Sequence, residues 1–155
     1  MPLKDKNWFK TGGSARYFCK PTTAQQFQEA LTFAKNNNLA MFILGQGANI
    51  VISDAGFEGL VIRPQLNSIS YQEQADNTVL VTAGAGVTMD QLIQETLNNN
   101  ITGLEDFSAI PSSVGGAVYI NLHYFDKLIS QFLVSAEIFN IKFKAIRLPR
   151  KFKSN

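Results

Sequence analysis

Short apolar runs that stop at loops of glycine and other small residues are the strongest constraint in this sequence. Residues 41–44 form a continuous apolar run, as in a buried strand, and Gly45-Gln46-Gly47 ends it at once. Residues 110–117 form a second loop of small residues. A backbone without Cβ approaches a phosphate closely, and successive amides form an anion-binding nest. The loops therefore favour an anion site, although tight turns would explain the same glycines. The first loop has neither a Walker ending nor a dinucleotide fingerprint.

Two segments carry the pattern of amphipathic helices that begin after a capping threonine. Thr23 precedes Gln26 by three residues, and apolar residues then recur at helical spacing up to the asparagines at 36–38. Thr88 and Gln91 repeat this arrangement before a second asparagine triplet. The predicted apolar face of the second helix is formed by Met89, Leu92, Ile93 and Leu97. Serines at 112 and 113 are placed to cap a third helix that runs from Val114 towards Leu122, and the amides of this loop could face an anion.

Further short runs predict strands. Residues 50–53 and 60–63 are separated by a stretch whose two glycines suit a tight turn, and 69–72 and 79–82 flank polar residues suited to a hairpin. Aromatic and β-branched residues over 132–141 and 143–148 predict a closing hairpin. We expect this region to pair with another copy of the chain, giving a homo-oligomer. Helices and strands together indicate a compact mixed fold.

Composition excludes several classes of protein. One cysteine, Cys19, cannot form an internal disulfide, and with one histidine, His123, it cannot complete a usual zinc site. No apolar run approaches the length of a membrane span. The last fourteen residues, 142–155, carry six basic residues and no acid, which leaves eight basic and twelve acidic residues before them. We therefore expect no specific nucleic-acid site. The polar amino terminus lacks a signal-peptide pattern, so the cytoplasm is the expected location.

No catalytic group stands out from the sequence. One histidine cannot be argued into a Ser-His-Asp arrangement, and His123 is expected to be a packed residue. Cys19 is expected to be a small core residue. Glu105-Asp106 is expected to be a solvated loop or the start of a helix. No catalytic residue and no metal ligand is therefore assigned.

Three motifs in register resemble a known family. Residues 7–15, 43–49 and 110–118 are similar in sequence, order and spacing to the UDP-N-acetylenolpyruvoylglucosamine reductase family. The likeness runs from about residue 7 to about residue 141. It implies an α+β fold, the two-lobed FAD-binding domain of the vanillyl-alcohol-oxidase type. The first lobe would be 1–63 and the second, incomplete, 64–141, followed by the basic tail 142–155, with the family's substrate domain absent.

The resemblance also implies the cofactor and the residues around it. In the family, the two loops wrap the pyrophosphate of FAD and approach the flavin ring, and amides can bind a diphosphate without a lysine in the loop. A side chain added at Gly47 or Gly116 is therefore expected to block FAD and leave the fold intact. The cofactor-binding residues carried over to this chain are Gly45, Gln46, Gly47, Ala48, Asn49, Ile50, Ile110, Pro111, Ser113, Val114, Gly115, Gly116, Ala117 and Asn121.

This sequence departs from the family pattern at three places. Ala48 stands where the family usually has serine, and Ser112 stands where it usually has glycine. After Asn121 the family continues with small residues, whereas this chain has the bulky run 122–125. From Lys142 onward nothing of the family is recognisable. The bulky run is expected to crowd the flavin pocket.

The family transfers hydride from NADPH through flavin to an enolpyruvyl double bond, and a serine or cysteine of the substrate domain protonates the product. The preferred hypothesis is therefore a truncated FAD-binding domain of this flavin reductase of peptidoglycan precursor synthesis, which does not complete the reaction alone. One alternative is a working reductase whose substrate domain comes from another chain. The other is a non-enzymatic binding or assembly protein that kept the fold and lost the flavin.

Overall fold

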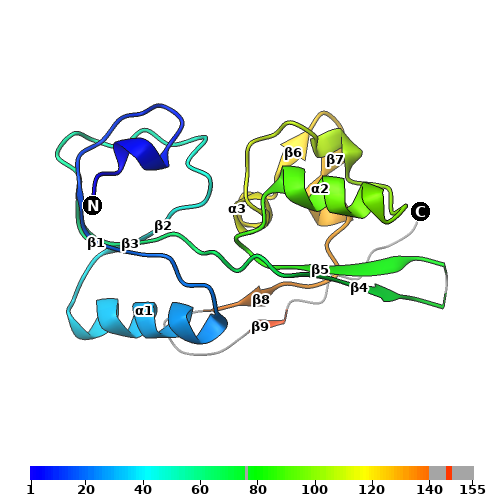
Figure 1. Cartoon of the computed structure of the whole chain (residues 1–155), viewed down its shortest axis with the longest axis horizontal. Coiled ribbons are helices and arrows are strands. Elements are labelled where there is room, and N and C mark those ends of the chain that lie inside the picture. Colours follow the sequence, from blue (N-terminus) through cyan, green and yellow to red (C-terminus); the bar gives the residue numbers. More distant parts are fainter. Residues whose placement is uncertain (76, 140–145, 148–155) are drawn as a thin grey trace.

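The computed structural model describes residues 1–75, 77–139 and 146–147, and it has two lobes side by side (Figure 1). The first lobe contains a parallel sheet of β1 (Ala15–Cys19), β2 (Met41–Ile43) and β3 (Phe57–Ile62), in the order β1-β3-β2. Helix α1 (Ala24–Asn36) lies against this sheet. Parallel neighbours need a crossover, and α1 supplies it between β1 and β2.

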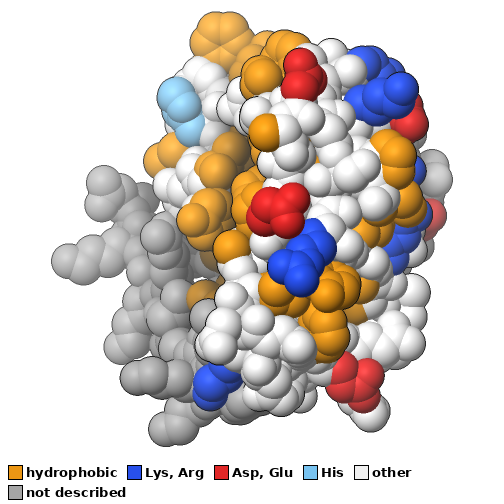
Figure 2. Space-filling model, turned by 90° about the vertical axis from the view of Figure 1, so that its left-hand side faces the viewer, with side chains coloured by type: hydrophobic (Ala, Val, Ile, Leu, Met, Phe, Trp, Pro, Cys, Tyr) orange, Lys and Arg blue, Asp and Glu red, His pale blue; other side chains and the backbone are white. Residues whose placement is uncertain are grey.

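Strand β3 builds the core of the first lobe by alternating its side chains. Leu60 and Ile62 pack with Leu31 and Ala34 of α1 on one face of the sheet. Val61 points to the other face and packs with a cluster of the amino-terminal segment and the strands, which comprises Leu3, Ala15 and Leu44. The amino-terminal segment, which includes the 3-10 helix η1 (Lys4–Lys6), therefore covers the face opposite α1. Figure 2, which views the molecule from the left-hand side of Figure 1, shows hydrophobic side chains exposed among charged ones.

Residues 50–53 are not a strand, contrary to the sequence-based expectation. Ile50 and Ile52 do pack on the first-lobe core, which explains their apolar character. Their backbone bonds to the amino-terminal segment and not to the sheet, because the Ile52 amide donates to Thr11 Oγ1 at 3.3 Å and Ser53 O accepts from Gly13 N at 3.0 Å. Of the two predicted turn glycines, Gly56 lies in the turn and Gly59 lies inside β3.

The second lobe begins with the antiparallel hairpin β4 (Ile69–Glu73) and β5 (Val79–Ala83), as predicted. Helix α2 (Met89–Asn98), the 3-10 helix η2 (Glu105–Phe107) and α3 (Val114–Tyr119) follow. A short hairpin, β6 (His123–Tyr124) and β7 (Lys127–Leu128), leads to the 3-10 helix η3 (Ile129–Gln131). The core of this lobe is formed by Met89, Ile93, Phe107, Ala117, Leu122 and Ile129.

The predicted helix starts are confirmed at both capping threonines. Thr23 accepts from the Gln26 amide at 3.2 Å, and Thr88 accepts from the Gln91 amide at 3.0 Å. The predicted apolar face of α2 is wrong at one position, because Leu97 is 39% exposed while Thr96 is buried. The Thr96 hydroxyl can take this place since it donates to the Ile93 carbonyl at 2.9 Å within the same helix.

The chain then returns to the first lobe. Phe139 packs beside Phe27 of α1, with ring centroids 5.8 Å apart, next to β8 (Glu137–Ile138). Strand β8 pairs antiparallel with β9 (Ile146–Arg147), so the predicted closing hairpin exists but is much shorter. Residues 132–136 are not a strand, and most of the basic tail lies outside the described residues. Within the described part of the chain, no helix is long and apolar enough to cross a membrane.

Candidate functional site

The loop after β2 offers a run of backbone donors. Leu44 makes the last bond to the sheet, from its amide to the Ile62 carbonyl at 2.8 Å. None of the five amides from Gly45 to Asn49 has a hydrogen-bond acceptor within the described part of the chain. Gly47 is nevertheless buried. Unpaired amides at such positions are uncommon, and consecutive ones form the concave donor arrays that hold phosphates.

The amino-terminal segment anchors this loop from the other side. The Gly47 carbonyl accepts from the Trp8 amide at 3.0 Å. The buried Asn7 side chain shapes the turn beside it, donating from Nδ2 to the Leu3 carbonyl at 2.9 Å and to the Thr11 carbonyl at 2.8 Å. The first motif of the sequence, which begins at Asn7, therefore supports the glycine loop. Asn7 was not among the predicted site residues, although its place in that motif was the available signal.

In the second predicted loop, residues 110–117, the amides at the start of α3 donate to acceptors within the protein. Ser113 caps α3 and accepts from the Gly116 amide at 3.2 Å. The Val114 amide donates to Val87 O at 2.8 Å, and the Gly115 amide donates to Ala85 O at 3.0 Å. The expectation that amides of this segment face an anion is therefore wrong for these three. They hold α3 against the loop that follows β5.

The two predicted loops do meet in space. A Cβ built on Gly45 would lie 2.8 Å from Ser113 Oγ, so the first loop touches the cap of α3. A Cβ on Gly115 would lie 2.9 Å from the Ala85 Cβ. Small residues from three separate parts of the chain therefore gather where the lobes join. This is the point at which a ligand held by the first loop would also reach α3.

The other predicted residues divide between surface and core. Gln46 and Ala48 are half-buried, and Asn49 and Pro111 are exposed. Ile50 packs on the first-lobe core, while Ala117 lies in the second-lobe core with Ile110 packed against it. Asn121 Oδ1 accepts from the Ser130 amide at 3.2 Å and so ties α3 to η3. Ile50, Ile110, Ala117 and Asn121 thus have structural roles that a motif comparison does not reveal.

The bulky run 122–125 does not gather in one place. Leu122 is buried in the second-lobe core, whereas Phe125 is 80% exposed at the tip of the β6–β7 hairpin. His123 is exposed as well, so the expectation of a packed histidine is wrong. Glu105 is the first residue of η2 and accepts from the Gly103 amide at 2.6 Å, as expected for the start of a helix.

Sequence reasoning missed a group of basic residues beside the first loop. Lys6, Lys10 and Arg63 line a hollow with Trp8 and Gln46. The position of Arg63 follows from the sheet, because Ile43 of β2 pairs with Ile62 of β3, which brings the two carboxyl ends to the same edge. Long-range register of this kind is not visible in one sequence. Among the described residues, no cluster of three or more His, Cys, Asp or Glu could hold a metal ion.

The chain is similar in sequence to curated reductases. The chain is 40% identical over 135 residues to the UDP-N-acetylenolpyruvoylglucosamine reductase of Treponema denticola, covering 86% of this chain and 42% of the relative. It is 30% identical over 158 residues to the reductase of Treponema pallidum, covering 99% of this chain and 45% of the relative. The chain thus spans less than half the length of these curated relatives, and its resemblance to them is confirmed.

Solved structures and a family comparison agree on the fold. The reductase of Thermus caldophilus superposes with a TM-score of 0.71 at 24% identity, covering 90% of this chain and 48% of that one. A solvent-stable cholesterol oxidase gives 0.67 at 16% identity, covering 93% and 32%. These likenesses confirm the expected α+β fold class. Residues 15–141 match the family described as FAD binding domain, which confirms FAD as the family's cofactor. Because that match spans most of the sequence, the chain belongs to the family of FAD binding domains.

Proposed function

We propose that this chain holds the diphosphate of FAD on the loop from Gly45 to Asn49. The observation that carries the proposal is the run of five amides with no acceptor among the residues that the structure describes, placed where a parallel strand ends. Ligands of open parallel sheets bind at the carboxyl ends of the strands, and a diphosphate accepts from several amides at once. The residues present therefore fit the cofactor that the family implies.

Around this loop, the chain's own residues position the ligand. The Trp8 amide and the buried Asn7 side chain fix the loop, so its amides are preorganised before a ligand arrives. Ser113 closes the site from the second lobe through its contact with Gly45. The predicted residues from Ile110 to Gly116 would contact the cofactor mainly through their side chains and through the Cα atoms of the glycines, because the amides at the start of α3 already have acceptors. We also propose that the boundary between the two FAD-binding lobes lies between residues 63 and 64.

The activity of the complete protein is also a proposal. Its relatives are named UDP-N-acetylenolpyruvoylglucosamine reductases. The chain would contribute the cofactor half of an NADPH-dependent reduction of UDP-N-acetylglucosamine enolpyruvate, with a cytoplasmic location, where that nucleotide sugar and NADPH occur. Bound FAD supplies hydride transfer. No residue of this chain is assigned to proton donation or to clamping the substrate, functions that the resemblance places in another part of the relatives.

A comparison of flavins tests the proposed cofactor site. The purified chain is mixed with FAD or with riboflavin, which lacks the diphosphate, and bound flavin is measured by absorbance after gel filtration. We expect near-equimolar FAD and little riboflavin, because the amides hold the diphosphate and not the ring. Persistent absence of flavin bands after excess FAD would contradict the proposal and favour a binding protein that has lost the cofactor. Equal retention of riboflavin would contradict the assignment to the amide loop.

A further inference from the structure

An open hollow of about 340 Å³ lies beside the amide loop, between the amino-terminal segment and the end of β3. Its basic side chains come from two parts of the chain, Lys6 and Lys10 from the segment around η1 and Arg63 from the residue after β3. Lys6 and Arg63 are half-buried. Gln46 belongs to both the hollow and the amide loop, so the two donor sets are continuous.

Within the described part of the chain, the positive charges of the hollow outnumber its negative charges. Among the described residues that line the hollow, Asp5 is the one carboxylate, against three cations. None of the three cations makes an ion pair with a described residue. Like charges held close to one another favour binding of an anion, since an anion relieves their repulsion as well as pairing with each. Lys and Arg also supply the strong, charge-assisted donors that phosphoryl oxygens prefer.

The number of donors indicates the class of anion. Five amides that have no acceptor among the described residues and three cations come from three separate segments of the chain, so an anion with two phosphoryl groups can engage more of them than a single phosphate or carboxylate can. A diphosphate offers two phosphoryl groups and more than one negative charge, which matches a donor array of this extent. Glycine loops of this kind bind phosphoryl groups through neutral backbone amides. In this chain, the positive charge that pairs with the diphosphate would come from residues outside the loop.

We propose that Lys6, Lys10 and Arg63 form the charged half of a diphosphate site whose neutral half is the loop from Gly45 to Asn49. The inference rests on the proposed function in placing a diphosphate at that loop. The diphosphate could come from FAD or from a nucleotide such as UDP, and competition between the two distinguishes these sources. In either case the positive charge strengthens binding and makes it sensitive to salt.

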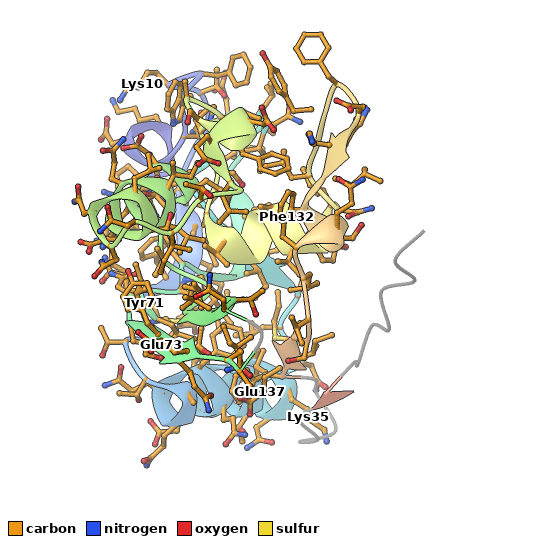
Figure 3. All side chains as sticks on the ribbon, turned by 90° about the vertical axis from the view of Figure 1, so that its right-hand side faces the viewer. Lys10, Lys35, Tyr71, Glu73, Phe132 and Glu137 are labelled. Atoms are coloured by element: carbon orange, nitrogen blue, oxygen red, sulfur yellow. The ribbon has the colours of Figure 1, made fainter. Side chains whose placement is uncertain are left out.

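Trp8 makes the hollow directly observable, because it is the single tryptophan of the chain, lines the hollow and is 63% exposed. Inorganic pyrophosphate, which carries no flavin, should change its fluorescence in a saturable way. Lys10→Gln and Arg63→Gln should each raise the Kd for pyrophosphate about tenfold, since each removes one charge-assisted partner. Lys10→Arg should keep binding. Lys35→Gln is the matched control, because Lys35 lies at the opposite end of the molecule from Lys10 (Figure 3).

Competition then separates the sources of the diphosphate. If FAD displaces pyrophosphate and UDP does not, the charged half serves the cofactor, and the FAD affinity of the two Gln variants should fall in parallel. If UDP displaces it and FAD does not, the inference stands with a nucleotide as the source.

Circular dichroism of each variant checks that it is folded. Unchanged pyrophosphate affinity in folded Lys10→Gln and Arg63→Gln, or no pyrophosphate response in the parent, would overturn the inference. Failure of the parent to bind FAD would instead contradict the proposed function.

Discussion

Gly47 is required by the packing of its loop against the amino-terminal segment, independently of any ligand. Its φ is +70°, and a Cβ there would lie 2.5 Å from the Lys6 carbonyl oxygen and 2.8 Å from the Asn7 Cα. The sequence predicts that a side chain at Gly47 would project into the diphosphate space and leave the fold intact. The structure contradicts the second part, because the side chain would first push away the amino-terminal segment. A Gly47 variant therefore reports on this anchoring as well as on any ligand.

Gly45 and Ser113 allow a cleaner test of where the two loops meet. Gly45 has no positive φ, so its substitution is limited by space and not by backbone conformation. We expect Gly45→Ala to lower the free energy of unfolding by roughly 1–3 kcal/mol, because the new Cβ would lie 2.8 Å from Ser113 Oγ. In a Ser113→Ala background the same change should cost less, by at least about 0.5 kcal/mol. Urea unfolding of the four proteins measures this coupling, and strictly additive effects would contradict the contact.

The thiol of Cys19 is expected to make the stability of the chain sensitive to alkaline pH. Burial raises the pKa of the Cys19 thiol above its ordinary value. The thiol should therefore react with iodoacetamide more slowly in the folded chain than in concentrated urea at mildly alkaline pH. The stability from this shift is fully present below the unfolded pKa and is lost as pH rises through the folded pKa. Cys19→Ala should lack that alkaline decline, and equal reaction rates in both states would contradict the prediction.

The elements that the sequence predicts best are those with local signals at both ends. Helices α1 and α2 follow capping threonines and stop at asparagine triplets, and the hairpin of β4 and β5 has its own polar turn. Residues 50–53 were predicted wrongly because an apolar pattern reports burial, whereas a strand also needs a neighbour to pair with. For the same reason the sequence leaves the stretch of β1, around Cys19, as strand or coil, since its partner β3 lies some forty residues away.

Only the parts of the candidate site that have local sequence signals were predicted. The two loops were found from glycine content and motif resemblance, both of which are local. Whether an amide is free depends on distant acceptors such as Val87 O and Ala85 O, which occupy the amides at the start of α3. The cations of the hollow depend on the parallel pairing of β2 with β3. Sequence patterns therefore identified the loops, while three-dimensional pairing decides which donors remain available.

The cap of α1 gives a prediction for an isolated element. Thr23 accepts from the Gln26 amide, and the Gln26 side chain in turn accepts from the Thr22 amide at 2.9 Å. Thr23→Ala should lower the free energy of unfolding by about 1 kcal/mol, because the helix loses a partner for one of its first amides. Thr23→Ser should retain most of the stability, since serine keeps the hydroxyl acceptor. Thermal unfolding followed by circular dichroism checks both, and equal losses for Ala and Ser would argue against the cap.

The surface formed by residues 132–138 leaves apolar side chains exposed. Phe132 is 40% exposed, Val134 51% and Ile138 41%. We expect the chain to self-associate at micromolar concentration through this region, since exposed apolar residues next to a short strand favour pairing with another copy. Combining Val134→Lys with Ile138→Lys should weaken association, whereas Val51→Lys in the first lobe should not. Sedimentation that shows a strict monomer for the parent would contradict this expectation.

The isolated polypeptide is expected to lack the reductase activity of its relatives. The chain spans 42–49% of the reductases it resembles, and the resemblance places proton donation and substrate clamping beyond Lys142. Positioning and general acid catalysis normally contribute several orders of magnitude to a rate. We therefore expect residues 1–155 with FAD to show no NADPH oxidation that depends on UDP-N-acetylglucosamine enolpyruvate, while slow reduction of the flavin by NADPH can persist. Absorbance at the NADPH band, with and without the sugar nucleotide, measures both. Turnover at about 1 per second or more would contradict the prediction and require a proton donor within this chain, for which Ser112, Ser113, Cys19 and His123 would be the residues to substitute first.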